Sequence, residues 1–308
     1  MFPTADTKTH PRMLRAQTIV KRTKAGFRTH MGNSASSEIT TDSNAGIRVC
    51  LDELCTALQK LVGNGLEDGL HKDLSEMLMN ELAPYLGSVP LVAALMAHED
   101  GQVITERAHL AMVHEGIGTT STDVIDAWLR SLPSMNAFAE VPDACMKVTG
   151  RMADRVVDGP IWVIGADHPR VSMGLQQAGG TRKIIPIEWA PPNEFSPEAE
   201  SPALIVVPGL LEAVPDRYAI RLLSSLRQAL LPGGRMVASA LGPSDDSAFA
   251  DLVLGWPTHR RSPAQLLDLF ILSGLAIVSD VPSPKPGLVV IAQDKSDAMS
   301  SSSETKNG

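Results

Sequence analysis

"ALIVVPGLLEAVPDRYAIRLLSSLRQALLPGGRMVASALG", residues 203–242, contains the pattern that decides the fold class. Residues 203–209 are an apolar run, 216–234 have the period of an amphipathic helix and end in two glycines, and 235–242 (RMVASALG) are a second, largely apolar segment. Uninterrupted apolar runs are typical of parallel strands that are covered on both faces. The stretch therefore predicts a strand, a crossover helix and a second, parallel strand.

The same alternation continues on both sides of this stretch. Upstream, "IWVIGADHP" (161–169) predicts a buried strand that runs into a loop, 170–180 a helix, and "KIIPIEW" (183–189) a second strand. Downstream, 263–274 predict a helix, and the apolar runs 275–281 and 287–293 are close enough to form a hairpin. The sequence predicts an α/β domain over residues 159–293 with a mostly parallel sheet and an antiparallel pair at one edge.

The rest of the chain has a different pattern. Residues 46–158 carry apolar positions three or four apart, which predicts a helical subdomain. Residues 1–45 are rich in Thr, Ser and basic residues and are expected to form a disordered leader, and the polar residues 294–308 a disordered tail. "MGNSAS" (31–36) matches an N-myristoylation pattern, which matters only if translation starts at Met31.

Composition excludes several classes of protein. The formal net charge of −8 disfavours a nucleic-acid binder, because contacts to phosphates require a basic surface. No apolar run approaches the roughly 20 residues of a membrane-spanning helix, and no signal-peptide pattern follows the basic residues near the start. The three cysteines fit neither a paired disulfide framework nor a zinc site. We expect a cytoplasmic protein.

The order of these elements resembles class I S-adenosylmethionine-dependent methyltransferases. Residues 203–242 look like that family's fourth strand, helix and fifth strand, and "LLPGGRMV" is similar to the turn before its fifth strand. The resemblance implies a Rossmann-like sheet and S-adenosylmethionine as the cofactor. The segment 188–202 has no apolar period, so the family's third strand is expected to be missing and the sheet shortened.

A narrower resemblance concerns "GWPTHRRSPAQLLDL" (255–269) and "VPLVAALMAHEDGQVITERAHL" (89–110). Both stretches are similar to a bacterial branch of these enzymes that is associated with methyl esters of 3-hydroxy fatty acids. This resemblance implies that the acceptor is a small or acyl carboxylate.

The resemblance implies a cofactor site at the ends of the strands. Its residues would be Gly165 and Asp167 in the first loop, Glu188 at the end of the second strand, and Gly209 and Glu212 after the following strand. Glycine lets the backbone approach a ligand closely, and an acidic residue after the second strand accepts hydrogen bonds from ribose hydroxyls. The alternative for Glu188 is that it is a solvated carboxylate at the end of a strand. Glu212 either faces the sulfonium of the cofactor or caps the next helix.

Two further residues are candidates for catalysis. His168 in the first loop is either a base or adenine contact, or an exposed loop residue. Arg261 could orient an acceptor carboxylate through a bidentate guanidinium contact, and is otherwise a surface charge.

Two hypotheses on function remain open. In the first, the protein is a divergent methyltransferase acting on a small or acyl carboxylate. In the second, it has lost its cofactor and is a regulatory protein that binds a protein partner. Val163, Asp167 and Pro169 occupy positions where the family has an acidic residue and glycines, which favours impaired or lost cofactor binding. An NAD-type oxidoreductase is disfavoured, because no G-x-G-x-x-G pattern follows the first strand.

Overall fold

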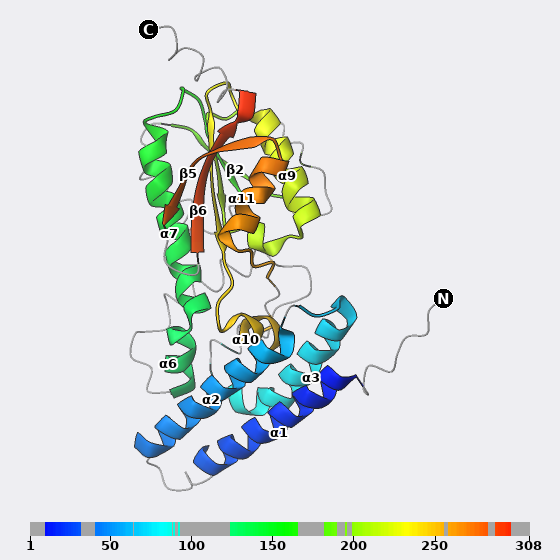
Figure 1. Ribbon diagram of the computed structural model, residues 1–308. Helices are drawn as coiled ribbons and strands as arrows, with labels where there is room; N and C mark the ends of the chain where they lie inside the picture. The colour runs from blue at the N-terminus through cyan, green and yellow to red at the C-terminus, as the bar shows by residue number, and fades with distance from the viewer. Residues whose placement is uncertain are drawn as a thin grey trace, which may run out of the picture. The chain divides into compact units, whose positions relative to one another are not determined.

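The computed structural model describes residues 10–31, 41–63, 65–87, 89, 92, 124–165, 182–189, 195, 199–255, 258–282 and 287–296. They form an α/β protein with a six-stranded mixed sheet and an N-terminal helical region, as the sequence predicted (Figure 1). Within these residues, no helix is long and apolar enough to cross a membrane.

The sheet has the strand order β2-β1-β3-β4-β6-β5. Its strands are β1 (Ile161–Ile164), β2 (Ile184–Ile187), β3 (Leu204–Pro208), β4 (Arg235–Leu241), β5 (Leu275–Pro282) and β6 (Gly287–Asp294). The first four are parallel, and β6 is antiparallel to both β4 and β5, so the predicted hairpin at one edge is confirmed. Between β2 and β3, the described residues 188–189, 195 and 199–203 belong to no strand, and β2 is an edge strand of the sheet.

Helices cover both faces of the sheet. On one face, α9 (Asp216–Ala229) and α11 (Pro263–Leu272) pack with residues such as Trp162, Ile205 and Ala238. On the other face, α7 (Pro133–Ala153) packs on Val163, Val206 and Val237, and Figure 1 shows it on the side of the sheet opposite to α9 and α11. Neighbouring residues of β1 and of β3 thus contact different layers, which explains why these two strands are apolar throughout.

Local sequence explains where the helices that cover the sheet begin and end. Ser262 forms a capping box with Gln265 at the start of α11, and Pro263 occupies the first position of the helix. After α9, Gly233 has a φ of +76°, a left-handed conformation that glycine adopts without steric cost. The turn that it allows brings Arg235 to the start of β4.

The helical region contains α1 (Pro11–Met31), α2 (Thr41–Val62), α3 (Asp68–Leu86), α6 (Val124–Ser131) and α10 (Ser247–Leu252). The prediction of a disordered leader over residues 1–45 is wrong for α1. Its buried residues recur at intervals of three and four: Met13, Ala16, Val20, Thr23 and Phe27. Alanine and threonine occupy two of these core positions, so composition concealed an ordinary amphipathic helix. Met31 ends α1, and residues 32–36 of the myristoylation-like motif lie outside the described residues.

The chain divides into two compact units whose boundaries differ from the predicted ones at 158 and 159. The helical unit includes α1, α2, α3, α6 and the segment 244–257 with α10, which follows β4 in the chain. The α/β unit includes the sheet, α9, α11 and α7 from residue 137 onward. The chain therefore leaves the α/β unit after β4 and re-enters it at Thr258, just before the residues of the candidate site.

A buried carboxylate organises part of the helical unit. Asp246 is 2% exposed, and its carboxylate accepts hydrogen bonds from the backbone N–H of Ser134 at 3.0 Å, the Ser134 hydroxyl at 2.9 Å and the Ser244 hydroxyl at 2.5 Å. Ser134 lies in the first turn of α7. An anion at this position accepts a hydrogen bond from an N–H of the first helical turn and is favoured by the helix dipole.

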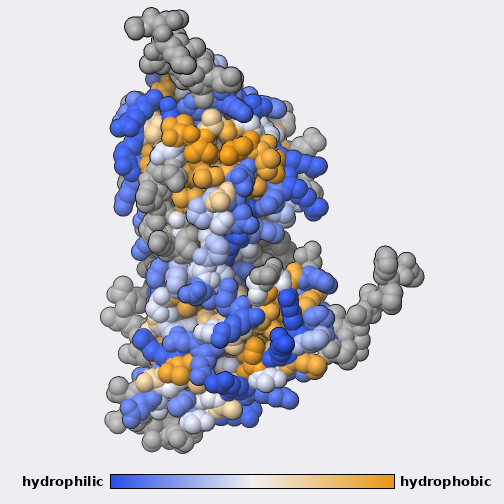
Figure 2. All heavy atoms as spheres, viewed as in Figure 1, coloured by the Kyte–Doolittle hydropathy of each residue, from blue (hydrophilic) through white to orange (hydrophobic). Residues whose placement is uncertain are grey.

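An apolar area lies on the surface of the α/β unit. Figure 2 shows hydrophobic atoms gathered over the part of this unit formed by α11, β5 and β6. The exposed apolar side chains there include Ile271, Leu272 and Val278. Ile271 and Leu272 end α11, and two residues separate them from the start of β5, which is level with the amino ends of the parallel strands. This area is therefore at the end of the sheet opposite to the candidate site described below.

Candidate functional site

The strand order marks one place in the sheet as a candidate ligand site. β1 has β2 on one side and β3 on the other, so the chain reverses its direction of travel across the sheet between β2 and β3. In open α/β sheets, ligands bind beyond the carboxyl ends of the strands at such a switch point. Here the carboxyl ends are marked by Gly165 after β1, Glu188 after β2 and Gly209 after β3.

Gly165 continues β1 by one residue and then turns the chain. Its N–H donates a hydrogen bond to the carbonyl of Ile187 at 2.9 Å, and its φ of +71° is in the left-handed region. A Cβ atom at this position would be 3.6 Å from the Leu210 side chain, an ordinary contact distance. Conformation rather than lack of space therefore makes glycine the suitable residue here.

Gly209 makes the corresponding turn after β3. It is buried, its φ is +66°, and its N–H contacts both the carbonyl oxygen of Ser239, at 3.1 Å, and the Ser239 Oγ, at 3.0 Å. Ser239 was not predicted as a site residue, although a serine within the largely apolar segment 235–242 is a visible signal. Ser239 is fully buried in β4 and fixes the position of the turn after β3.

Glu188 and Glu212 differ in exposure. Glu188 is exposed directly after β2, followed by the buried Trp189, so its carboxylate is accessible to a ligand. Glu212 is 2% exposed and lies in η2 (Leu211–Ala213), the short 3-10 turn after Gly209. The interpretation of Glu212 as a helix cap is wrong, because the N-cap of α9 is Pro215 and no side chain caps that helix.

A buried thiol lies near Glu212 and Ser239. Burial raises the pKa of Cys145, in α7, to about 12, and the negative charge of Glu212 acts in the same direction. Hydrogen bonds with Ser239 and Thr149 act in the opposite direction. Cys145 is therefore a neutral, buried thiol at physiological pH, and it lacks the thiolate character that reactive cysteines have.

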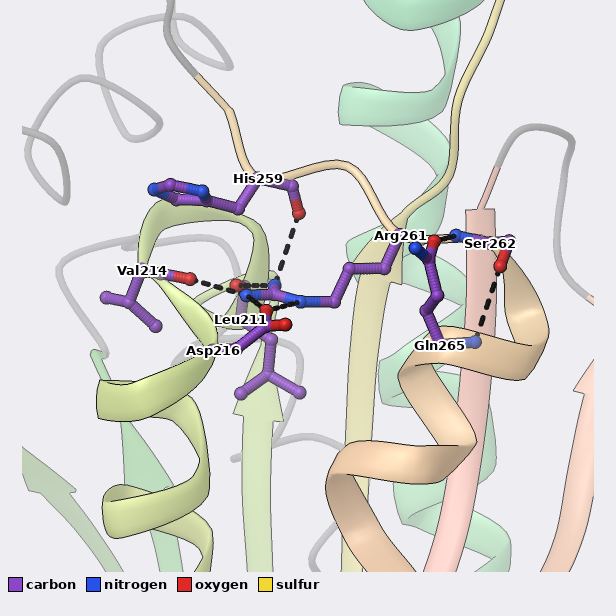
Figure 3. A network of polar contacts seen from close by, with 7 residues as sticks. All are labelled: Leu211, Val214, Asp216, His259, Arg261, Ser262 and Gln265. Atoms are coloured by element: carbon purple, nitrogen blue, oxygen red, sulfur yellow. Dashed lines mark hydrogen bonds and ion pairs between the residues drawn. The ribbon is translucent and has the colours of Figure 1, made fainter. Parts of the chain in front are cut away.

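Arg261 has a different role from the predicted contact with an acceptor carboxylate. The side chain is 5% exposed, and all the N–H groups of its guanidinium face acceptors of the protein (Figure 3). The acceptors are the carbonyls of Leu211, Val214 and His259 and the carboxylate of Asp216. No donor is left for a bidentate contact with a substrate, so the sequence interpretation is wrong on this residue. The sequence pattern at this position is two consecutive arginines before a helix. This pattern does not distinguish a buried guanidinium from an exposed one.

The loop after β1 is only partly described. Asp167 and His168 lie outside the described residues, so their predicted roles stay predictions. His259, two residues before Arg261, has an exposed side chain, and its backbone N–H donates to the carbonyl of Glu212 at 2.6 Å. In the part of the chain that the structure describes, no group of three His, Cys, Asp or Glu side chains could hold a metal ion.

No protein-family model matches the sequence, and a search of curated proteins found no match. Among solved structures, the chain is similar to a putative O-methyltransferase from Nostoc punctiforme PCC 73102, with 13% identity, 92% of this chain and 96% of that chain covered, and a TM-score of 0.42. It is also similar to the pyocyanin biosynthetic protein PhzM, with 12% identity, 91% and 94% covered, and a TM-score of 0.40. A third similar structure is the glycopeptide N-methyltransferase MtfA in complex with S-adenosylmethionine, with 14% identity, 51% and 88% covered, and a TM-score of 0.34. TM-scores below 0.5 do not establish a shared function.

Proposed function

We propose that this protein binds S-adenosylmethionine at the carboxyl ends of β1, β2 and β3 and transfers its methyl group to a small-molecule acceptor. One observation carries the proposal: the switch point of the sheet lies between two left-handed glycine turns, Gly165 and Gly209, with Glu188 on one side and Glu212 on the other. This is the position at which open α/β sheets bind ligands.

The side chains of the site fit the chemistry of the cofactor. Glu188 is exposed, and its carboxylate can accept hydrogen bonds from the two hydroxyls of a ribose. Glu212 places a carboxyl group in a nearly water-free environment after β3, where a negative charge would favour a sulfonium cation. The site therefore has one group for the sugar and one for the charged end of the ligand.

S-adenosylmethionine supplies a methyl group bound to a positively charged sulfur. In the transfer, an oxygen of the acceptor attacks the methyl carbon in line, the carbon–sulfur bond breaks, and its electron pair stays on the sulfur of S-adenosylhomocysteine. The protein's main task is to align the two reactants and exclude water. A carboxylate acceptor is already ionised at neutral pH and requires no base. Since the donors of Arg261 are occupied, the acceptor carboxylate of this hypothesis would need another anchor.

Calorimetric titration with S-adenosylmethionine and S-adenosylhomocysteine tests the proposal. We expect dissociation constants in the micromolar range for the wild type and at least about tenfold weaker binding for Glu188→Ala, because a charged hydrogen bond contributes about 1.5–3 kcal/mol. Glu200→Ala is the matched control, since Glu200 is an exposed carboxylate farther along the same connection. Absence of binding at millimolar ligand would overturn the proposal and favour the non-catalytic, partner-binding hypothesis.

The acceptor is identified in a second step. Incubation with S-adenosylmethionine that carries a labelled methyl group, in the presence of free and carrier-linked hydroxy acids, tests the predicted class of acceptor. Transfer of label to a carboxylate supports it. Transfer to a hydroxyl or amine instead would retain the methyltransferase proposal and refute the carboxylate acceptor.

A further inference from the structure

We propose that Arg261 is a positioning residue that fixes η2, and with it Glu212, at the β3 end of the site. The inference rests on the proposed function only where it concerns the ligand. The geometry of the turn can be tested without any ligand.

The guanidinium contacts the backbone on both sides of Glu212. Nη1 donates to the carbonyl of Leu211, the residue before it, and Nη2 donates to the carbonyl of Val214 at 2.6 Å. Nη1 also contacts the carbonyl of His259 at 3.2 Å. Figure 3 shows these carbonyls converging on the guanidinium from the turn and from the segment before α11. One planar cation thus joins two stretches of backbone about 50 residues apart in the chain.

Asp216 completes the set of acceptors. Its Oδ1 lies 2.8 Å from Nε and 2.7 Å from Nη2 of Arg261. The Asp216 side chain is 70% exposed, whereas the Arg261 side chain is 5% exposed. An exposed carboxylate contributes little through its charge, because water screens it. The buried contacts to backbone carbonyls are therefore the ones that hold the turn.

Backbone hydrogen bonds reach the turn from two parts of the chain. Within it, the N–H of Ala213 donates to Leu210 at 3.0 Å and that of Val214 donates to Leu211 at a long 3.5 Å. Further support comes from the segment that carries Arg261: the N–H of His259 donates to the carbonyl of Glu212, and the N–H of Arg261 donates to the carbonyl of Leu241, at the end of β4, at 3.4 Å. Without the guanidinium, the Leu211 and Val214 carbonyls would lose their buried donors, and the turn would be free to move.

Arginine suits this position better than lysine. Its five N–H groups lie in one plane and point in fixed directions, so they can bind several carbonyls and a carboxylate at once. A lysine ammonium has three donors on a flexible chain and could replace only some of these contacts. This difference supplies a graded series of variants.

The test uses Arg261→Met, Arg261→Lys and, as a matched control, Arg221→Met, which removes an exposed arginine from α9. Amide hydrogen exchange is measured first, without ligand. We expect exchange at Ala213, Val214 and His259 to be at least about tenfold faster in Arg261→Met, intermediate in Arg261→Lys and unchanged in Arg221→Met, because local opening sets these rates. Unchanged exchange at the turn in Arg261→Met would overturn the inference. Equally faster exchange at Leu222 and Leu223 inside α9 would also overturn it, because it would reveal a general stabilising role.

The second readout is the dissociation constant of S-adenosylhomocysteine, measured below the unfolding temperature of each variant. We expect about a tenfold increase for Arg261→Met, a smaller increase for Arg261→Lys and no change for Arg221→Met. An unchanged constant in Arg261→Met would overturn the role in ligand binding. If the wild type fails to bind, the proposed function fails, while the exchange measurement still decides whether Arg261 positions the turn.

Discussion

Two buried charged side chains, Asp246 in the helical unit and Arg261 in the α/β unit, hold backbone in opposite ways. Asp246 accepts hydrogen bonds from neutral donors of Ser134, at the start of the 21-residue helix α7, and of Ser244. Arg261 donates to carbonyls around η2, a turn of only three residues. The first network anchors a long helix, and we infer that its loss affects stability most. The second anchors a short turn beside the candidate site, and we infer that its loss affects ligand binding most.

The largest expected change in stability is for Asp246→Ala. This variant removes the carboxylate that accepts from the buried Ser134 N–H, and with it the anion at the start of α7. We expect the free energy of unfolding to fall by about 3–4 kcal/mol, because several buried hydrogen bonds to a charged group are lost together. Denaturation by urea measures it. Asp245→Ala is the control, because Asp245 is the exposed neighbour. Equal effects of the two variants would contradict the role assigned to the Asp246 network.

Arg261→Met is expected to have a smaller effect on stability and a larger one on the ligand. We expect the free energy of unfolding to fall by about 2 kcal/mol, since the turn can rearrange so that its carbonyls reach water. The dissociation constant of S-adenosylhomocysteine should rise about tenfold in the same variant, whereas Asp246→Ala should leave it within about twofold. A loss of binding in Asp246→Ala that matches the loss in Arg261→Met would remove the distinction between the two networks.

Alkaline pH should weaken the α/β unit through Cys145. The folded state raises the pKa of this thiol to about 12 from the ordinary 9.0, so the unfolded chain releases the proton first. Its contribution to stability is complete below about pH 9 and is lost as the pH rises toward 12. In denaturation series from pH 8 to 10.5, Cys145→Ser should show a shallower loss than the wild type, by up to about 1.4 kcal/mol per pH unit. Identical slopes would contradict the burial of a neutral thiol.

The smallest effect is expected for an exposed ion pair. Arg22 and Glu53 join α1 and α2 at 3.0 Å, but their side chains are 76% and 52% exposed. We expect Arg22→Ala to change the free energy of unfolding by less than about 0.5 kcal/mol, because water and salt screen such pairs. The urea midpoint at low and high salt checks this. A cost comparable to that of Arg261→Met would show that burial does not separate the two kinds of contact.

The sequence predicted the sheet well, because most of its strands are largely apolar segments bounded by turn residues. It therefore also predicted that Gly165, Glu188 and Gly209 would follow strand ends. It did not predict α1, since alanine and threonine at its buried positions give the segment a polar composition. Nor did it predict the role of Arg261. The main partners of Arg261 are backbone carbonyls, which every residue has, so no residue type in the sequence indicates them.

Hydrogen exchange with and without S-adenosylhomocysteine tests the central claim, that the ligand binds at the switch point of the sheet, most directly. At saturating ligand, we predict slower exchange at Gly165, at Glu188–Trp189 and from Gly209 to Val214, with α1 and α2 unchanged. A saturable interaction that leaves these amides unaffected, or that protects only the helical unit, would contradict the account.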